Sequence, residues 1–258
     1  MASSRTKAYI NVDLGEGYGN YVCGPDKELL PYIDFANVAC GFHAGDPLIM
    51  AKTVQLCKEA NVKVGAHPGL PDIQGFGRRE ITMTPEEHTA NIIYQVSALQ
   101  GFLNQHGMKL NHVKPHGILY GMMIRNMDVA RAVWAGVPAG VPVFGLAGTN
   151  METAAREAGL EFWAEYFADV KYTKEGMLFI DRVKTPWDPK VVRERVRSQF
   201  FESKVIAETG ELIDLPVKGN PTTICCHSDS PGCVEIVKIT REVADEYNRP
   251  WNTRCKDL

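Results

Sequence analysis

The chain has 258 residues, with 28 lysines and arginines against 31 aspartates and glutamates, and its formal net charge is -3 at pH 7. This near balance argues against nucleic acid or an anionic membrane surface as the main partner. Hydrophobic residues make up 45% and charged residues 23% of the chain, which excludes a disordered protein and is typical of a globular one with a large core.

The length fits one α/β barrel, a fold of about 250 residues. We expect a single catalytic-type domain over residues 1–258, with its core from about 8 to 247 and an irregular tail over 248–258. The first residues are polar, and no segment approaches about 18 consecutive apolar residues. Seven irregularly spaced cysteines favour reduced thiols. The sequence therefore predicts a soluble, cytoplasmic protein that does not bind a membrane.

Short apolar runs alternate with longer amphipathic stretches, which is typical of βα units and a parallel sheet. Several of the runs are almost entirely apolar, as expected for strands that helices cover on both faces. The predicted strands, in chain order, are Tyr9–Leu14, Phe35–Cys40, Val62–Ala66, His112–Pro115, Val141–Leu146, Leu160–Tyr166 and Thr222–Cys226.

The clearest helix follows the third predicted strand. Thr84 and Glu87 form a capping box, Pro85 occupies the first helical position, and Gly107 provides the stop. About seven strand–helix units favour a barrel or a doubly wound sheet. The predicted helices are Leu48–Ala60, Pro85–His106, Asn150–Ala158, Pro189–Phe201 and Gly232–Tyr247.

Chemically capable residues fall repeatedly at or just beyond the C-terminal ends of the predicted strands. In α/β barrels and open parallel sheets alike, that edge carries the active site. Six of about seven ends carry His, Asp or both, which solvated turn residues would produce only by coincidence. These residues are Asp13 and Glu16, His43 and Asp46, His67 and Asp72, His116, Asp169, and His227 and Asp229.

Alternation along the strands sharpens this pattern. Asn11 and Asp13 share one face of the first strand, as Lys114 and His116 share one face of the fourth, and in a barrel both pairs could point inward. A buried charge is costly unless it is paired. Asp13 and Lys114 therefore form a structural ion pair or meet a ligand, and the ion pair alone leaves the neighbouring histidines unexplained.

The histidines at the strand ends allow two kinds of chemistry. Two or three of them with one aspartate could hold a divalent metal in an open site, for which the candidates are Asp13, His67 and His116. Without a metal, the same groups could act as general acid and base. The spacings are long and contain no His-x-x-x-His pair, so they do not choose between the two.

Other motifs are weaker or absent. The basic turn Gly75–Arg79 suits a carboxylate or phosphate, although a surface turn that pairs with local acids fits it equally well. Gly15–Gly19 lacks the last glycine of a dinucleotide fingerprint, and the sequence contains neither an ATP-binding P-loop nor a Gly-x-Ser-x-Gly elbow. For Cys40, beside the expected site, tight packing is favoured over a nucleophilic role.

Six motifs, dense in the first 150 residues, span residues 11–16, 36–46, 65–68, 75–79, 112–117 and 145–148. Together they resemble the LamB/YcsF family, which includes the A subunit of bacterial 5-oxoprolinase and fungal lactam-utilisation proteins. The resemblance implies a distorted (β/α) barrel of about seven strands, similar to the glycoside hydrolase/deacetylase barrel. It also implies hydrolysis of the C–N bond of 5-oxoproline or a related cyclic amide, driven by ATP, with B- and C-type partner subunits.

A mechanistic hypothesis follows from the motifs. Asp13 with His43, His67 or His116 activates water, while Lys114 and Arg78 hold developing or phosphate charge. The expected substrate-binding residues are Asn11, Glu16, Asp46, Arg78, Asp169 and His227.

Two positions depart from the family's usual pattern. Val170 follows Asp169 where the family usually has arginine, and Ser228 stands where it usually has glycine. Two other interpretations therefore stay open beside the ATP-dependent subunit. One is a metal-dependent amidohydrolase or deacetylase that acts alone, and the other is a family member that has lost catalysis.

Overall fold

The computed structural model describes residues 6–179, 184–217 and 219–252. At its centre lies a six-stranded parallel sheet in the order β3-β2-β1-β10-β5-β4. Six of the seven predicted strands are confirmed, with ends that differ from the prediction by at most two residues. The strands are β1 (Tyr9–Leu14), β2 (Phe35–Ala39), β3 (Lys63–His67), β4 (Val143–Gly145), β5 (Phe162–Phe167) and β10 (Thr222–His227).

The seventh predicted strand, His112–Pro115, is wrong as a regular strand, but the segment closes the sheet. Val113 forms parallel bridges to Ala66 of β3 and to Val143 of β4, the two edge strands. The Lys114 N–H donates to the Ala66 carbonyl over 2.9 Å. The proline that ends the segment has no N–H and cannot extend the ladder. The result is the expected distorted barrel, which residues 111–116 close through backbone hydrogen bonds along β3 and through those of Val113 to Pro142 and Phe144.

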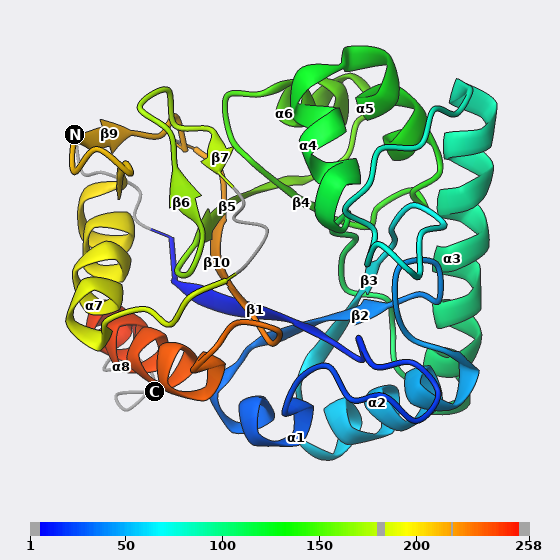
Figure 1. Cartoon of the computed structure of the whole chain (residues 1–258), viewed down its shortest axis with the longest axis horizontal. Coiled ribbons are helices and arrows are strands. Elements are labelled where there is room, and N and C mark those ends of the chain that lie inside the picture. The colour runs from blue at the N-terminus through cyan, green and yellow to red at the C-terminus, as the bar shows by residue number, and fades with distance from the viewer. Residues whose placement is uncertain (1–5, 180–183, 218, 253–258) are drawn as a thin grey trace.

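Helices surround the strands in Figure 1 and cover the outside of the barrel. All five predicted helices are present, and the one predicted over Pro189–Phe201 divides into α7 and the π-helical turn η2. None of the helices in the described ranges is both long and apolar enough to cross a membrane. The helices are α1 (Asp26–Leu29), η1 (Leu30–Tyr32), α2 (Pro47–Glu59), α3 (Pro85–Gln105), α4 (Gly117–Arg125), α5 (Met127–Ala135), α6 (Asn150–Glu157), α7 (Pro189–Arg197), η2 (Ser198–Glu202) and α8 (Cys233–Asn252).

Two short antiparallel hairpins were not predicted. Strand β6 (Lys171–Tyr172) pairs with β7 (Leu178–Phe179), and β8 (Lys204–Ile206) pairs with β9 (Leu212–Asp214). Strands of two or three residues are too short to show alternation. Figure 1 places β6, β7 and β9 together at the upper left.

The last helix extends beyond the predicted core. Residues 248–252 belong to α8, so the expected irregular tail is wrong there, and 253–258 lie outside the described residues. Asn248 accounts for the extension, because its buried amide donates to the Ala8 carbonyl and its oxygen accepts from the Ala8 N–H, each over 2.9 Å. This pair of bonds ties the end of α8 to the start of β1.

Aromatic rings fill the barrel at the N-terminal ends of its strands. Phe35 lies with its ring centroid 5.2–5.7 Å from those of Tyr9, His112, Phe144 and Trp163. His112 also stacks on Phe144 at 3.9 Å. Because this end is plugged, a ligand can reach the barrel interior only from the C-terminal ends of the strands.

The capping box of α3 gives a first test of the fold. The Thr84 hydroxyl accepts from the Glu87 N–H over 3.3 Å, and the Glu87 carboxylate accepts from the Thr84 N–H over 2.7 Å. We expect Thr84→Ala to lower the free energy of unfolding in urea by about 1 kcal/mol. Ser97→Ala, on the exposed face of the same helix, should change it by less than about 0.5 kcal/mol. Equal losses in both variants would contradict the capping role.

Candidate active site

Polar side chains from several strand ends converge at the C-terminal rim of the barrel. A cavity of about 400 Å³ opens between them, within the range of about 300–1,000 Å³ that is usual for small-molecule sites. The structure thus brings together groups that lie up to 214 residues apart in the sequence. The charged and titratable residues that line the cavity are Asp13, His67, Arg78, Lys114, His116, Arg125, Lys184 and His227.

The rest of the cavity wall is largely apolar. Helix α4 supplies one side of it, beginning directly after His116, and the β6–β7 hairpin supplies another. A ligand that fits here has an apolar face as well as polar groups. The apolar and aromatic lining residues are Ile118, Tyr120, Ile124, Phe167, Val170, Met177 and Leu178.

Asp13 and Lys114 form an ion pair that is also part of the cavity wall. Lys114 Nζ lies 2.9 Å from Asp13 Oδ1, and the two side chains are 2% and 3% exposed. Burial would raise the pKa of Asp13, but His67 and Lys114 hold it well below its usual value. Burial likewise opposes a charge on Lys114, but Asp13 holds that pKa well above its usual value. Both groups are therefore charged at neutral pH, and Lys114 is a fixed cation beside the ligand.

A hydrogen-bonded layer beneath the ion pair holds Asp13 in place. The Asn37 amide donates to Asp13 Oδ1 and to Asn11 Oδ1, each over 2.7 Å. His112 Nε2 lies 2.6 Å from Asn37 Oδ1, and the Asn11 amide donates to the Thr223 hydroxyl over 3.0 Å. Asn11 was expected to bind substrate, but the structure buries it completely and gives it this supporting position.

Glu165 is a second buried acid in this layer that the sequence analysis missed. Its Oε1 lies 3.3 Å from Lys114 Nζ, and its side chain is fully buried. Burial raises the pKa of Glu165, although Lys114 acts in the opposite direction. Burial and the neighbouring Glu165 also raise the pKa of Tyr120. Burial therefore opposes the charged form of Glu165, whereas Asp13 is ionised beside Lys114.

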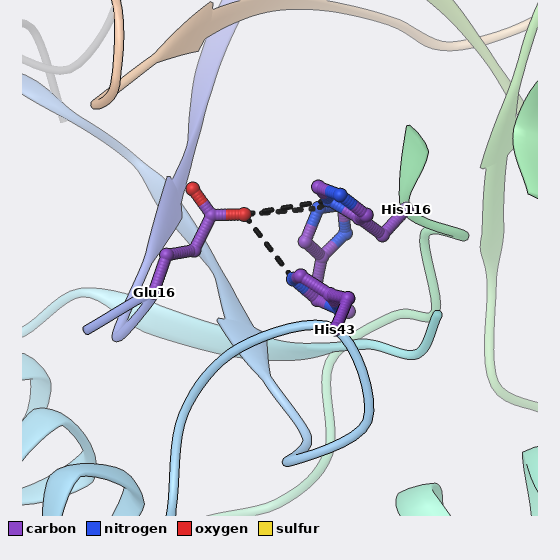
Figure 2. Close-up of side chains that lie close together, drawn as sticks. Glu16, His43 and His116 are labelled. Atoms are coloured by element: carbon purple, nitrogen blue, oxygen red, sulfur yellow. Dashed lines mark hydrogen bonds and ion pairs between the residues drawn. The ribbon is translucent and has the colours of Figure 1, made fainter. Parts of the chain in front are cut away.

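Glu16 and three histidines form a compact buried cluster at the edge of the cavity. Figure 2 shows Glu16 pointing toward the stacked rings of His43 and His116, whose centroids are 3.6 Å apart. Glu16 Oε1 lies 3.2 Å from His43 Nε2, 3.4 Å from His116 Nδ1 and 4.0 Å from His67 Nε2. One donor atom from each residue lies within 4.8 Å of the others, so the cluster has the composition and spacing of a metal centre.

Burial controls the protonation of this cluster. It raises the pKa of Glu16 well above the usual value, and the charges of Asp13 and Asp229 add to the effect. It lowers the pKa values of His43 and His116 well below theirs. Uncharged imidazoles, the form that can accept a proton or a cation, are therefore favoured.

Asp169 orients His227 toward the cavity. Its Oδ1 lies 2.8 Å from His227 Nδ1, and its Oδ2 accepts from the His227 backbone N–H and from the Ser230 hydroxyl. Burial would raise the pKa of Asp169, but His227 above all holds it far below its usual value. Because the ionised carboxylate accepts a hydrogen bond from Nδ1–H, the free nitrogen of the neutral ring is Nε2, which lies 3.7 Å from Asp13 Oδ2. An imidazole whose Nδ1–H is hydrogen-bonded to a carboxylate, with Nε2 facing the cavity, is the usual arrangement of a histidine general base.

Two cations flank one carboxylate beside the cavity. Arg78 donates to Asp229 over 2.7 Å, and Lys184 contacts the other oxygen of Asp229. The neighbouring Arg79 has a 62% exposed side chain and pairs with Asp72. Of the predicted anion-binding turn, only Arg78 therefore belongs to the cavity lining. Lys184 comes from a segment without regular structure, and no sequence pattern pointed to it.

The two residues that depart from the family pattern, Val170 and Ser228, are both buried. Val170 lines the cavity, and Lys184 supplies a cation to the same wall. Ser228 is buried against Gly24, where a Cβ atom would lie 2.6 Å from the serine Cβ. Its backbone is unstrained, since the positive-φ residues other than glycine in the described ranges are Asn61, Phe76 and Ser203.

Two further sequence candidates have structural positions. Asp46, expected to contact substrate, instead caps α2 by accepting from the N–H groups of Leu48 and Ile49, and it also accepts from Gly19. Burial raises the pKa of the Cys40 thiol to about 12. A thiol of this kind is a poor nucleophile at neutral pH, which agrees with the packing role favoured from the sequence.

Comparisons with known proteins agree with this architecture. The sequence pattern of the LamB/YcsF family matches residues 9–254. The lactam utilization protein lamB of Emericella nidulans is 61% identical over 97% of this chain and 99% of its own length. The A subunit of 5-oxoprolinase from Pyrococcus horikoshii is 45% identical over 92% and 93% of the two chains. The crystal structure of a lactam utilization protein from Thermus thermophilus is 39% identical, with a TM-score of 0.84 over 93% of this chain and 96% of that one.

Proposed function

Because this chain belongs to the LamB/YcsF family, we propose that it opens a lactam ring by hydrolysis as one component of an ATP-dependent enzyme. The names of its relatives favour 5-oxoproline or a related cyclic amide as substrate, and B- and C-type subunits as partners. We place the reaction in the cytoplasm, where ATP is available. The observation that carries the proposal is one cavity lined by a carboxylate, a fixed ammonium and an oriented imidazole, from Asp13, Lys114 and His227.

In this proposal ATP activates the lactam, which is otherwise unreactive toward water. An unstrained lactam resists water because its nitrogen lone pair weakens the carbonyl carbon as an electrophile. Transfer of the γ-phosphoryl group of ATP to the lactam oxygen removes that resonance. Addition of one water and cleavage of the C–N bond then give an amine and an acyl phosphate, from which a second water releases phosphate. Since the sequence has no P-loop, we assign ATP binding at least partly to the partner subunits.

In this scheme Asp13 and His227 activate the attacking water. Their facing atoms are 3.7 Å apart, a separation that one water molecule can bridge. His227 Nε2 takes the proton of the water, and Asp169 stabilises the imidazolium that results. The carboxylate of Asp13 holds the second hydrogen of the water and so sets its orientation.

The cationic side chains of the cavity stabilise negative charge on the substrate. Lys114 stabilises the negative charge of the phosphoryl group on the lactam oxygen and of the acyl phosphate that follows, because its ammonium is fixed and shielded from solvent. Arg78 and Lys184 lie in the same lining and suit a substrate carboxylate or a phosphoryl group. The apolar wall from α4 faces the methylene groups of the ring.

Reconstitution tests the proposal. The chain is mixed with B- and C-type subunits, ATP and either 5-oxoproline or 2-pyrrolidinone, and release of the amine is measured. We expect ring opening that needs ATP and all three chains. His106→Ala, which changes a residue at the far end of α3, should keep wild-type turnover. Turnover by the isolated chain without ATP would refute the scheme, as would no turnover of either lactam.

Asp169 offers a test with two readouts. We expect Asp169→Asn to lower turnover about 10³-fold, since the carboxylate no longer fixes the tautomer of His227. The folded-state pKa of Asp169 is lowered, so its ionised form stabilises the fold above the unfolded value of about 3.9, and this contribution is lost as the pH falls. The difference in unfolding free energy between wild type and variant should therefore shrink as the pH falls below about 4.

Asp128→Asn is the control, because that side chain is 82% exposed. It should change neither turnover nor the pH dependence of stability. A stability difference for Asp169→Asn that grows on acidification would contradict the ion-pair assignment.

The cluster around Glu16 favours one second candidate, a metal-dependent hydrolase that acts without partners. Turnover of a lactam or an N-acyl compound without ATP, abolished by a chelator, would support it over the ATP-dependent scheme.

A further inference from the structure

Two histidines of the cluster at Glu16 have fixed tautomers. His67 Nδ1 lies 2.7 Å from the Lys114 carbonyl oxygen, and His116 Nε2 lies 2.8 Å from the Phe76 carbonyl oxygen. A carbonyl oxygen only accepts hydrogen bonds, so each of these nitrogens carries a proton. In a neutral imidazole the other nitrogen is then a lone pair, which makes His67 Nε2 and His116 Nδ1 two acceptors.

These two acceptors face each other. His67 Nε2 and His116 Nδ1 are 3.0 Å apart, and His67 Nε2 also lies 3.3 Å from Asp13 Oδ2. Two neutral rings have no proton left for either contact, so a cation between these atoms would supply the positive charge that both contacts need. The Glu16 oxygen adds a third electron pair, 3.4 Å from His116 Nδ1. Carbonyls that fix one ring nitrogen and so aim the other at a common point are the usual support of metal-ligating histidines.

His43 completes the set, with its ring stacked on that of His116 (Figure 2). Its Nε2 lies 3.2 Å from Glu16 Oε1, while its buried Nδ1 has no hydrogen-bond partner in the described parts of the chain. A cation about 2.1 Å from four tetrahedral donors holds neighbouring donors about 3.4 Å apart. The measured separations of 3.0, 3.2, 3.4 and 4.0 Å bracket that value.

We propose that Glu16, His43, His67 and His116 bind one divalent transition-metal ion, with Zn²⁺ as the best fit. Three imidazole nitrogens and one carboxylate oxygen suit Zn²⁺ and its neighbours better than Mg²⁺ or Ca²⁺. His67 and His116 also line the lactam cavity, so the ion would lie in its wall and supply a Lewis acid there. Metal binding itself does not depend on the proposed function.

A second group of close donors, Asp13, Cys225 and His227, is different because it already holds a cation. Lys114 Nζ lies 2.9 Å from Asp13 Oδ1 and 2.8 Å from Cys225 Sγ. We therefore assign Glu16 and His43 as ligands beside His67 and His116, and Asp13, a candidate ligand from the sequence, to the ion pair with Lys114 and a contact of 3.3 Å with His67 Nε2.

Direct binding measurements test the site without partners, ATP or lactam. The chelator-treated chain is titrated with Zn²⁺ by calorimetry and with Co²⁺ by visible absorption. We expect one ion per chain, and an affinity more than about 100-fold lower in Glu16→Gln and in His43→Gln, because even outer partners of a ligand are worth about 10–100-fold. His106→Ala should bind as the wild type does. Zn²⁺ should raise the melting temperature of the wild type but of neither ligand variant.

The outcomes separate the two proposals. Circular dichroism of the metal-free variants checks that they are folded. The site is refuted if Zn²⁺, Co²⁺, Mn²⁺ and Fe²⁺ all fail to bind, or if both ligand variants bind as tightly as the wild type. One bound ion without ring opening in the reconstituted enzyme would refute the proposed function alone. Ring opening by a chain that binds no metal would refute the metal site alone.

Discussion

Replacing Lys114 with methionine should lower lactam turnover by about 10³-fold and destabilise the fold by about 3–5 kcal/mol. The loss of turnover follows from removing the fixed cation that stabilises the negative charge of the phosphorylated lactam. The loss of stability follows because Asp13, 3% exposed, would keep its charge without its partner at 2.9 Å. Turnover is measured in the reconstituted enzyme, and stability by urea unfolding of the isolated chain.

A double variant separates the two roles of Lys114. Asp13→Asn combined with Lys114→Met removes both charges, and should recover much of the lost stability without recovering turnover. Lys109→Met, at an exposed position, is the matched control and should behave as wild type. Full turnover in the Lys114→Met variant would mean that the ion pair is purely structural.

The second large effect is expected at Gly65, where β3 passes the ring of His112. A Cβ atom at Gly65 would lie 2.2 Å from His112 Nε2. The ring cannot move aside, because its Nε2 is hydrogen-bonded to Asn37 at 2.6 Å and the ring stacks on Phe144 at 3.9 Å. We expect Gly65→Ala to lower the free energy of unfolding by about 3 kcal/mol or more, at or above the upper end of the usual overpacking range.

Two further variants check this explanation. Gly101→Ala, in helix α3 with no atom within 4 Å of the added Cβ, should stabilise the chain by about 0.5–1 kcal/mol. Combining Gly65→Ala with His112→Ala should cost less than the sum of the single changes, since the clash is then removed. Additive losses would show that the steric argument is wrong.

The sheet and its outer helices were predictable because their signals are local. Strand β1 and helix α3 match their predictions within one residue, since one is an unbroken buried run and the other has a capping box and a stop. Helix α4 was missed because its sequence, Gly117–Arg125, is apolar nearly all round and has no polar stripe to mark a period. The irregular tail was predicted from composition, but Asn248 fixes the end of α8 through contacts with Ala8, 240 residues away.

Part of the candidate site was predictable, because two sequence rules locate its residues: their place at strand ends and the alternation of side chains along a strand. These rules pointed to Asp13, His67, Lys114 and His116, which line one cavity. They could not find Lys184, because the segment around it has no period, and they overrated Asp46, because a helix cap also places an aspartate just beyond a strand.

Glu165 shows a different limit. Its strand was predicted, but its partner Lys114 comes from a segment 51 residues earlier, and only the closed barrel brings them to 3.3 Å. The same applies to the pair of facing histidines, His67 and His116, whose tautomers depend on carbonyl groups that no sequence rule places.

The pairing of Val113 with both edge strands links closure of the barrel to the chemistry of its interior. Neighbouring residues of an extended segment point to opposite sides, so Lys114 faces inward only while Val113 stays opposite Ala66 and Val143. A register shift of this segment by one residue would point the Lys114 ammonium outward, toward the surrounding helices, and the Val113 side chain into the barrel. The register of this one short segment therefore determines whether the barrel interior contains the charged Lys114 side chain or an apolar one.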